Sequence, residues 1–124
     1  MEFRDRVVWL EAISGEEVVK LLQGASALIQ PSVYEGFGLP VLEAMACGCP
    51  VVAYRNSSLP EVVGDAGVLV EDGDAGALAR AAAEIALDPG RAAALRQAGL
   101  RRAPRFSWRQ AARATISAYR RLGL

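Results

Sequence analysis

The chain has 124 residues, 52% of them hydrophobic, and its 14 basic and 14 acidic side chains give a formal net charge of zero. This length can bury one core and is too short for two ordinary domains. Histidine is absent, which excludes histidine general bases, catalytic triads and the usual zinc sites, so carboxylates must carry any acid–base chemistry.

The sequence predicts a cytoplasmic protein, because it shows neither a membrane-spanning apolar run of about 18 residues nor the apolar core of a signal peptide. The two cysteines, Cys47 and Cys49, are separated by one residue. This spacing fits neither a disulfide framework nor a C-x-x-C redox motif. We therefore expect both to be small buried residues.

The first part of the chain reads as strand, helix, strand. Residues 6–10 are rich in β-branched and aromatic side chains, which predicts a strand. Ser14 and Glu17 have the spacing of a capping box, so a helix should follow and run toward residue 24. Residues 27–30 form the next predicted strand, which ends at a proline. The expected core face of the helix consists of Val18, Leu21 and Leu22.

Residues 31–48 read as a strand end, a glycine-bearing turn and a helix. Gly36 and Gly38 have no Cβ, so the backbone can take positive φ and a ligand can approach the amides closely. Pro40 belongs in the first helical turn, and Gly48 stands where a C-terminal cap is expected. Because a helix N-terminus presents unpaired N–H groups and partial positive charge, this turn suits a phosphate or pyrophosphate.

Two carboxylates frame the predicted turn. Glu35 precedes it, and Glu43 lies about one turn into the helix, where helical side chains point back toward the N-terminus. A carboxylate there can accept hydrogen bonds from both hydroxyls of a ribose. On spacing alone, the alternative is equally open: Glu43 is a solvated helix residue and the glycines make only a tight turn.

The remaining chain continues the alternation of strands and helices. Strands are predicted at residues 50–54 and 67–70, and helices at residues 75–87, 89–102 and 107–123; Ser58 and Glu61 repeat the capping-box spacing. The predicted N-caps are Asp74 and Ser107, and Asp88 with Pro89 is expected to start the helix at residues 89–102. This alternation predicts an α/β fold, a Rossmann-like parallel sheet of about four strands flanked by helices.

The charge is unevenly distributed, since all 14 acidic residues precede Arg91. In the last predicted helix, Arg109, Arg113 and Arg120 share one face. We considered a solvated or intramolecularly paired face, contact with a membrane surface, and nucleic acid; no nucleic-acid motif supports the last. The opposite face carries Trp108, Ala112, Thr115, Tyr119 and Leu122.

Residues 35–43, two glutamates with seven residues between them, resemble the signature of retaining nucleotide-sugar glycosyltransferases of family 4. This family is also described as glycosyl transferases group 1, and it has the GT-B fold. Residues 49–53, 58–70 and 106–108 resemble the family's following strand, its loop, helix and last strand, and the start of its terminal helix. The resemblance therefore covers nearly the whole chain.

The resemblance implies a donor-binding role. Glu35 would be the catalytic carboxylate near the transferred sugar, and Glu43 would hold the nucleotide ribose. The nucleotide-sugar is a substrate, so neither a cofactor nor a metal site is expected. Ser57 and Ser58 are weaker candidates for donor contact, since a capping role explains Ser58 equally well. The expected donor-binding residues of the turn are Gly36, Phe37, Gly38 and Leu39, with Phe37 packing on the core.

The resemblance also implies an incomplete site. The family's enzymes have two Rossmann-like domains with the active site between them, and residues 1–124 resemble only the later part of the C-terminal one. Lys20, the only lysine, does not match the family's donor-binding lysine, and Glu11 stands where the family often has glycine. We therefore expect a segment of a longer enzyme, inactive alone.

Three further expectations follow from this incompleteness. The unfilled sheet could self-associate with another copy. The chain could instead be a non-catalytic nucleotide- or sugar-binding module. It could also be a membrane-docking interaction segment whose basic last helix matters most.

Overall fold

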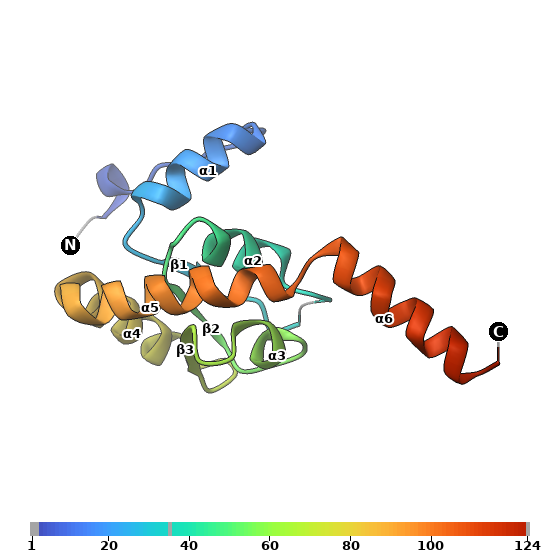
Figure 1. Ribbon diagram of the computed structural model, residues 1–124. Helices are drawn as coiled ribbons and strands as arrows, with labels where there is room; N and C mark the ends of the chain where they lie inside the picture. Colours follow the sequence, from blue (N-terminus) through green and yellow to red (C-terminus); the bar gives the residue numbers. More distant parts are fainter. Residues whose placement is uncertain (1–2, 35, 124) are drawn as a thin grey trace.

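The computed structural model describes residues 3–34 and 36–123. Within these residues, the centre of the fold is a parallel sheet of β1 (Leu28–Gln30), β2 (Val51–Tyr54) and β3 (Gly67–Val70), in the order β1-β2-β3 (Figure 1). The helices are α1 (Gly15–Gly24), α2 (Leu39–Ala46), α3 (Leu59–Val63), α4 (Ala75–Leu87), α5 (Pro89–Arg102) and α6 (Trp108–Arg121), with short 3-10 helices η1 (Arg4–Arg6) and η2 (Ala103–Arg105).

The strand β2 separates two layers of the core. All four of its residues are buried: Val51 and Ala53 belong to one apolar cluster, Val52 and Tyr54 to the other. The first cluster contains residues of α1, α2 and α3, and the second contains residues of α4. A strand buried on both faces is typical of a parallel α/β sheet, so the predicted fold class is confirmed.

Most helix boundaries follow from local capping signals, as the sequence predicts. Ser14 and Glu17 form a capping box, with Glu17 N–H to Ser14 Oγ at 3.2 Å and Ser14 N–H to Glu17 Oε2 at 2.9 Å. The side chains of Asp74, Asp88 and Ser107 likewise accept backbone N–H groups of the helices that they precede. Ser58 is the exception: it is the N-cap of α3 but has helical φ and ψ, and its side chain makes no capping hydrogen bond.

The strand predicted at residues 6–10 is wrong. Residues 4–6 form η1, and residues 7–10 have no regular structure. Val8 is 77% exposed and Trp9 is 82% exposed. A strand needs a neighbour for its backbone hydrogen bonds, and in a Rossmann order this segment would not adjoin β1. No described strand lies beside residues 7–10, so the sheet has three strands rather than about four.

The predicted core face of α1 is only partly right. Leu22 is buried and Val18 packs against the first cluster, but Leu21 is 49% exposed. In the described sheet, β1 is an edge strand, and an edge strand can pair with a strand of another chain. Self-association of two copies through this edge stays a prediction.

Neither cysteine forms a disulfide bond, and both act as small packing residues. Cys49 is buried and Cys47 is half-buried. Burial raises the pKa of the Cys49 thiol, the neighbouring Cys47 raises it further, and a backbone hydrogen bond with Leu28 opposes this shift. The thiol of Cys49 is therefore protonated at neutral pH and is a poor nucleophile.

The C-terminus of α3 is closed by an arginine from the distant helix α5. Arg102 donates from Nε to the carbonyl of Val62 (2.8 Å) and from Nη2 to the carbonyl of Glu61 (2.6 Å). A cation at a helix C-terminus is favourable because the last carbonyls carry partial negative charge. Gly64, which follows α3 with φ 53° and ψ −127°, leaves the space that the guanidinium occupies.

We predict that Gly64→Ala lowers the free energy of unfolding by about 3 kcal/mol, through backbone strain and displacement of Arg102 from its two carbonyls. Chemical denaturation should show this loss. The matched control is Gly73→Ala, where φ is 82° but an added Cβ meets no heavy atom within 4 Å. The single variant Arg102→Ala should also be less stable. In the double variant Gly64→Ala/Arg102→Ala, the loss of unfolding free energy should be smaller than the sum of the two single losses, and a loss equal to that sum would contradict this explanation.

Candidate functional site

The candidate site lies in residues 31–34 and 36–38 and in the first turns of α2. In a parallel sheet the carboxyl ends of the strands share one edge, where ligands of such folds collect. Residues 31–34 follow β1 at this edge, and residues 36–38 lead into α2. The sequence therefore positions the glycine-bearing turn where a ligand can reach it.

Gly38 is the N-cap of α2 and has φ 88° and ψ 41°, in the left-handed region. This confirms the predicted need for glycine at this position. Having no side chain, Gly38 leaves the N-terminal N–H groups of α2 without a side-chain cap. Pro40 lies in the first turn, as predicted. An added Cβ at Gly36 would meet no heavy atom of the described residues within 4 Å, so the approach to the turn is open.

Phe37 packs the turn against Phe106, the residue that follows η2. Its ring is 45% exposed and meets the ring of Phe106 edge to face, with centroids 6.1 Å apart. Phe106 in turn lies 5.7 Å from the guanidinium carbon of Arg102. Phe37 therefore makes a packing contact, but with Phe106 at the surface and not with the buried core as predicted. Leu39, the next predicted residue of the turn, is 55% exposed in the first turn of α2.

Glu43 is exposed on α2, a helix whose Val41, Ala44 and Met45 are buried in the core. These buried neighbours fix the helix, and therefore the position of the Glu43 backbone. Among the described residues, Glu43 takes part in no side-chain hydrogen bond or ion pair. Its carboxylate is therefore available to a ligand. Glu35, the other predicted carboxylate, lies outside the described residues.

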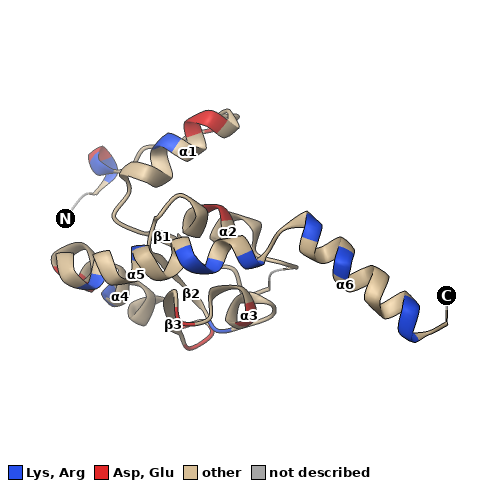
Figure 2. Ribbon diagram, viewed as in Figure 1, with Lys and Arg blue, Asp and Glu red and all other residues tan. Residues whose placement is uncertain are grey.

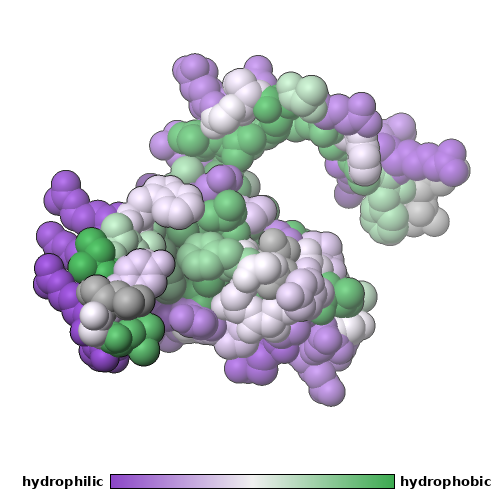
Figure 3. Space-filling model, turned by 90° about the vertical axis from the view of Figure 1, so that its right-hand side faces the viewer, coloured by the Kyte–Doolittle hydropathy of each residue, from purple (hydrophilic) through white to green (hydrophobic). Residues whose placement is uncertain are grey.

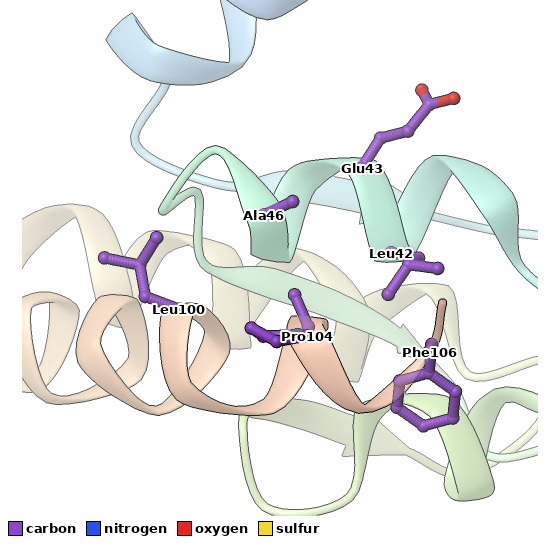
Figure 4. A pocket seen from close by; sticks show the side chains of 7 residues that line it. Leu42, Glu43, Ala46, Leu100, Pro104 and Phe106 are labelled. Atoms are coloured by element: carbon purple, nitrogen blue, oxygen red, sulfur yellow. The ribbon is translucent and has the colours of Figure 1, made fainter. Parts of the chain in front are cut away.

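Glu43 borders two hollows on the surface. The first, of about 360 Å³, lies between α2 and the segment from α5 through η2 to Phe106. Figure 4 shows its apolar lining, with the Glu43 carboxylate pointing away from the other labelled side chains. The second, of about 450 Å³, lies between α1 and α2, and we call it the α1–α2 groove. It is lined by Ile13, Gly15, Val18, Val19, Leu22, Glu43, Ala46 and Cys47.

The α1–α2 groove combines apolar walls with one carboxylate. Its walls are mostly apolar, which suits the faces of a base, and Glu43 adds a hydroxyl acceptor at its border. Sequence reasoning missed the groove-lining residues Ile13 and Val19. The helical spacing of Val18, Val19 and Leu22 shows one apolar helix face, but it does not say that part of this face remains open.

The described residues contain no group of three or more side chains that could bind a metal ion.

The loop after β2 contains Ser57, in the left-handed region with φ 49°, and the N-cap Ser58. Asn56, in the same loop, was not singled out by sequence reasoning. Its side chain donates to the carbonyl of Ser32 in the candidate turn. The sequence signal that could have identified Asn56 is its position just after a predicted buried strand.

Comparisons with known proteins identify relatives of the chain. The sequence model of the family described as Glycosyl transferases group 1 matches residues 1–102. The chain is 40% identical over 114 residues to the O-antigen chain mannosyltransferase B of Escherichia coli, covering 92% of this chain and 30% of that protein. It is 40% identical over 119 residues to the D-inositol 3-phosphate glycosyltransferase of Mycolicibacterium smegmatis, covering 94% and 27%.

Among solved structures, the sucrose-phosphate synthase of Thermosynechococcus elongatus matches with a TM-score of 0.83 and 37% identity, over 95% of this chain and 30% of that one. The chain thus spans about 30% of the length of these relatives. Its fold matches that of GT-B glycosyltransferases, as the sequence predicts. The chain belongs to the group 1 family of glycosyl transferases.

Proposed function

We propose that the chain forms the donor-binding part of a retaining glycosyltransferase, which moves a sugar from a nucleotide-sugar to an acceptor. One observation carries the proposal: the N-terminus of α2 lacks a side-chain cap, and Glu43 stands on the same helix beside an apolar groove. An anion-binding end, a hydroxyl acceptor and an apolar wall are together what a nucleoside diphosphate needs.

In this proposal, the nucleoside occupies the α1–α2 groove and Glu43 accepts hydrogen bonds from the ribose hydroxyls. The pyrophosphate lies over Gly36 and Gly38, where the backbone amides at the start of α2 can donate to it. These amides would stabilise the negative charge that develops on the leaving pyrophosphate, without reorganising during the reaction. Glu35 would stand near the transferred sugar, and the acceptor would attack from the face that the leaving group vacates. This scheme requires no metal ion.

Titration calorimetry of the chain with UDP and with GDP tests the proposal. We expect saturable binding of at least one of them, at a stoichiometry of about one, because Glu43 and the N-terminus of α2 act on the ribose and the pyrophosphate, which UDP and GDP share. A nucleoside without phosphates serves as the comparison and should bind more weakly, since it leaves the α2 amides unused. Absence of binding by both diphosphates at millimolar concentration would contradict the proposal.

A second role, docking on a membrane surface, is supported by the helix α6. No residue of α6 is buried, and the helix extends away from the body of the molecule (Figure 1). Its arginines are evident in Figure 2, and its sequence has no acidic residue. Its exposed apolar side chains are Trp108 (90%), Ile116 (50%), Tyr119 (54%) and Leu122 (73%).

These features suit a helix that lies in the headgroup region of an anionic bilayer. In Figure 3, purple hydrophilic and green hydrophobic groups gather on different parts of the molecular surface. No helix of the described residues combines the length and apolar character needed to cross a membrane. The proposed contact is therefore peripheral.

Replacing Arg109, Arg113 and Arg120 by glutamine should weaken binding to phosphatidylserine-containing vesicles by about a hundredfold, since each arginine near an anionic surface contributes about 1 kcal/mol. Sedimentation with vesicles measures the effect. The matched control replaces three exposed arginines outside α6, namely Arg4, Arg6 and Arg80. Equal binding by the α6 variant and the parent chain would remove this second role.

A further inference from the structure

Asn56 joins the loops that follow all three strands of the sheet. It lies in the loop after β2, and its Nδ2 donates to the carbonyl of Ser32 (2.9 Å) in the loop after β1. The same nitrogen donates to Oδ1 of Asp72 (2.8 Å) in the loop after β3. One side chain therefore connects three segments that are far apart in the sequence, at the edge where the candidate site lies.

The chemistry of this junction requires an amide. A backbone carbonyl and a carboxylate are both acceptors, and the two N–H groups of an asparagine side chain can serve one each. The opposite orientation of the amide would turn Oδ1 toward two acceptors, which is unfavourable. Aspartate has the same shape as asparagine but no donor, and its charge would repel Asp72.

A cost accompanies this arrangement. Oδ1 of Asn56 is buried and has no hydrogen-bond partner among the described residues. An unsatisfied buried oxygen is destabilising, so a residue chosen for stability alone would avoid it. The two donor bonds account for an asparagine at this position despite that cost.

The backbone that carries Asn56 is itself firmly held. The N–H of Arg55 donates to the carbonyl of Val70 (2.8 Å), and the N–H of Leu59 donates to the carbonyl of Asn56 (3.0 Å). The next residue, Ser57, is held in the left-handed region at φ 49°. Asn56 therefore projects from a segment fixed to β3 and α3, and it can fix what it binds.

What it binds is the base of the candidate turn. Ser32 is held at two points, because its carbonyl accepts from Asn56 and its Oγ accepts from Nε2 of Gln30 (2.7 Å). Gly36 and Gly38 follow in the same loop. We propose that Asn56 is a positioning residue of the donor site, which holds the start of the loop after β1 through the Ser32 carbonyl; this inference rests on the proposed function.

The first measurement is of loop order, and it does not depend on any ligand. Backbone ¹⁵N order parameters of the full chain should be near 0.85 at Ser32 and Val33, and should fall below about 0.6 in Asn56→Asp. Glu71→Gln, in the same loop as Asp72 but outside the junction, is the matched control and should leave them unchanged. If Asn56→Asp does not fold, Asn56→Ala and Asp72→Ala take its place.

The second measurement is of affinity. We expect Asn56→Asp to weaken UDP or GDP binding about tenfold, as expected for the loss of one hydrogen bond that orders the loop. The exchange variant Asn56→Asp/Asp72→Asn restores a donor–acceptor pair between the loops after β2 and β3, but not the bond to Ser32. Its melting temperature should therefore recover toward that of the parent chain, while its affinity should not.

Two results would overturn the inference. One is unchanged order parameters at Ser32 and Val33 in a folded Asn56 variant. The other is recovery of affinity together with stability in the exchange variant, which would indicate a purely structural role. If the parent chain binds no nucleoside diphosphate, the proposed function fails, whereas the order parameters still decide whether Asn56 holds the loop.

Discussion

Replacing Glu43 by alanine is expected to weaken the binding of nucleoside diphosphates to the chain by about a hundredfold. The proposed role of the carboxylate is to accept hydrogen bonds from two ribose hydroxyls, and each hydrogen bond to a charged group contributes about 1.5 kcal/mol or more. Together they correspond to about two powers of ten in the dissociation constant. Glu43→Gln keeps one acceptor oxygen, so its affinity for nucleoside diphosphates should fall only about tenfold. Titration calorimetry measures both variants.

The matched control is Glu61→Ala, which removes an exposed glutamate from the helix α3 and changes the net charge equally. It should bind like the parent chain. A 2′-deoxyribose diphosphate provides a complementary comparison: it should bind the parent chain more weakly, and the Glu43→Ala variant should discriminate less between the two sugars. Equal affinity of Glu43→Ala and the parent chain would show that Glu43 is a solvated helix residue.

Met45→Ala should have the largest effect on stability, lowering the free energy of unfolding by about 2–5 kcal/mol. Met45 is 1% exposed in the first apolar cluster, on the helix that carries Glu43. An added Cβ at Gly99 would lie 3.4–3.5 Å from Met45 atoms, which shows how closely α5 approaches α2 there. Truncating Met45 leaves a cavity in this contact, and the close-packed surroundings relax only partly.

Chemical denaturation checks this prediction, with Met45→Leu as the control of similar volume, which should cost less than about 1.5 kcal/mol. Since small domains are stable by only about 5–15 kcal/mol, Met45→Ala could unfold a substantial fraction of the chain. A loss below 1 kcal/mol in Met45→Ala would contradict the packing described for α2 and α5.

Features encoded within a few residues were predictable. The capping box of Ser14 and Glu17, the N-caps Asp74 and Ser107, and the glycine turn before α2 depend on neighbours a few positions away. Such contacts form whenever the local backbone is helical, whatever the rest of the chain does. The family could be recognised for a related reason, because its motif is contiguous.

Features that depend on contacts between residues far apart in the sequence were not predictable. Residues 7–10 have a strand composition, but a strand exists only beside another strand. Leu21 fits a helical apolar spacing, yet its exposure depends on what packs against α1. Ser58 has the right residue type for capping, but the tight segment after β2 gives it helical dihedral angles, so its side chain does not cap the helix.

By itself, the sequence determined the alternation of strands and helices, the helix ends and the glycine turn with its flanking glutamates. Tertiary structure alone decided the number of strands, the open α1–α2 groove beside Glu43 and the junction at Asn56. The physical reason is the parallel order of the sheet. It brings the loops after residues 30, 54 and 70 to one edge, and no pattern within any one loop encodes its contacts with the others.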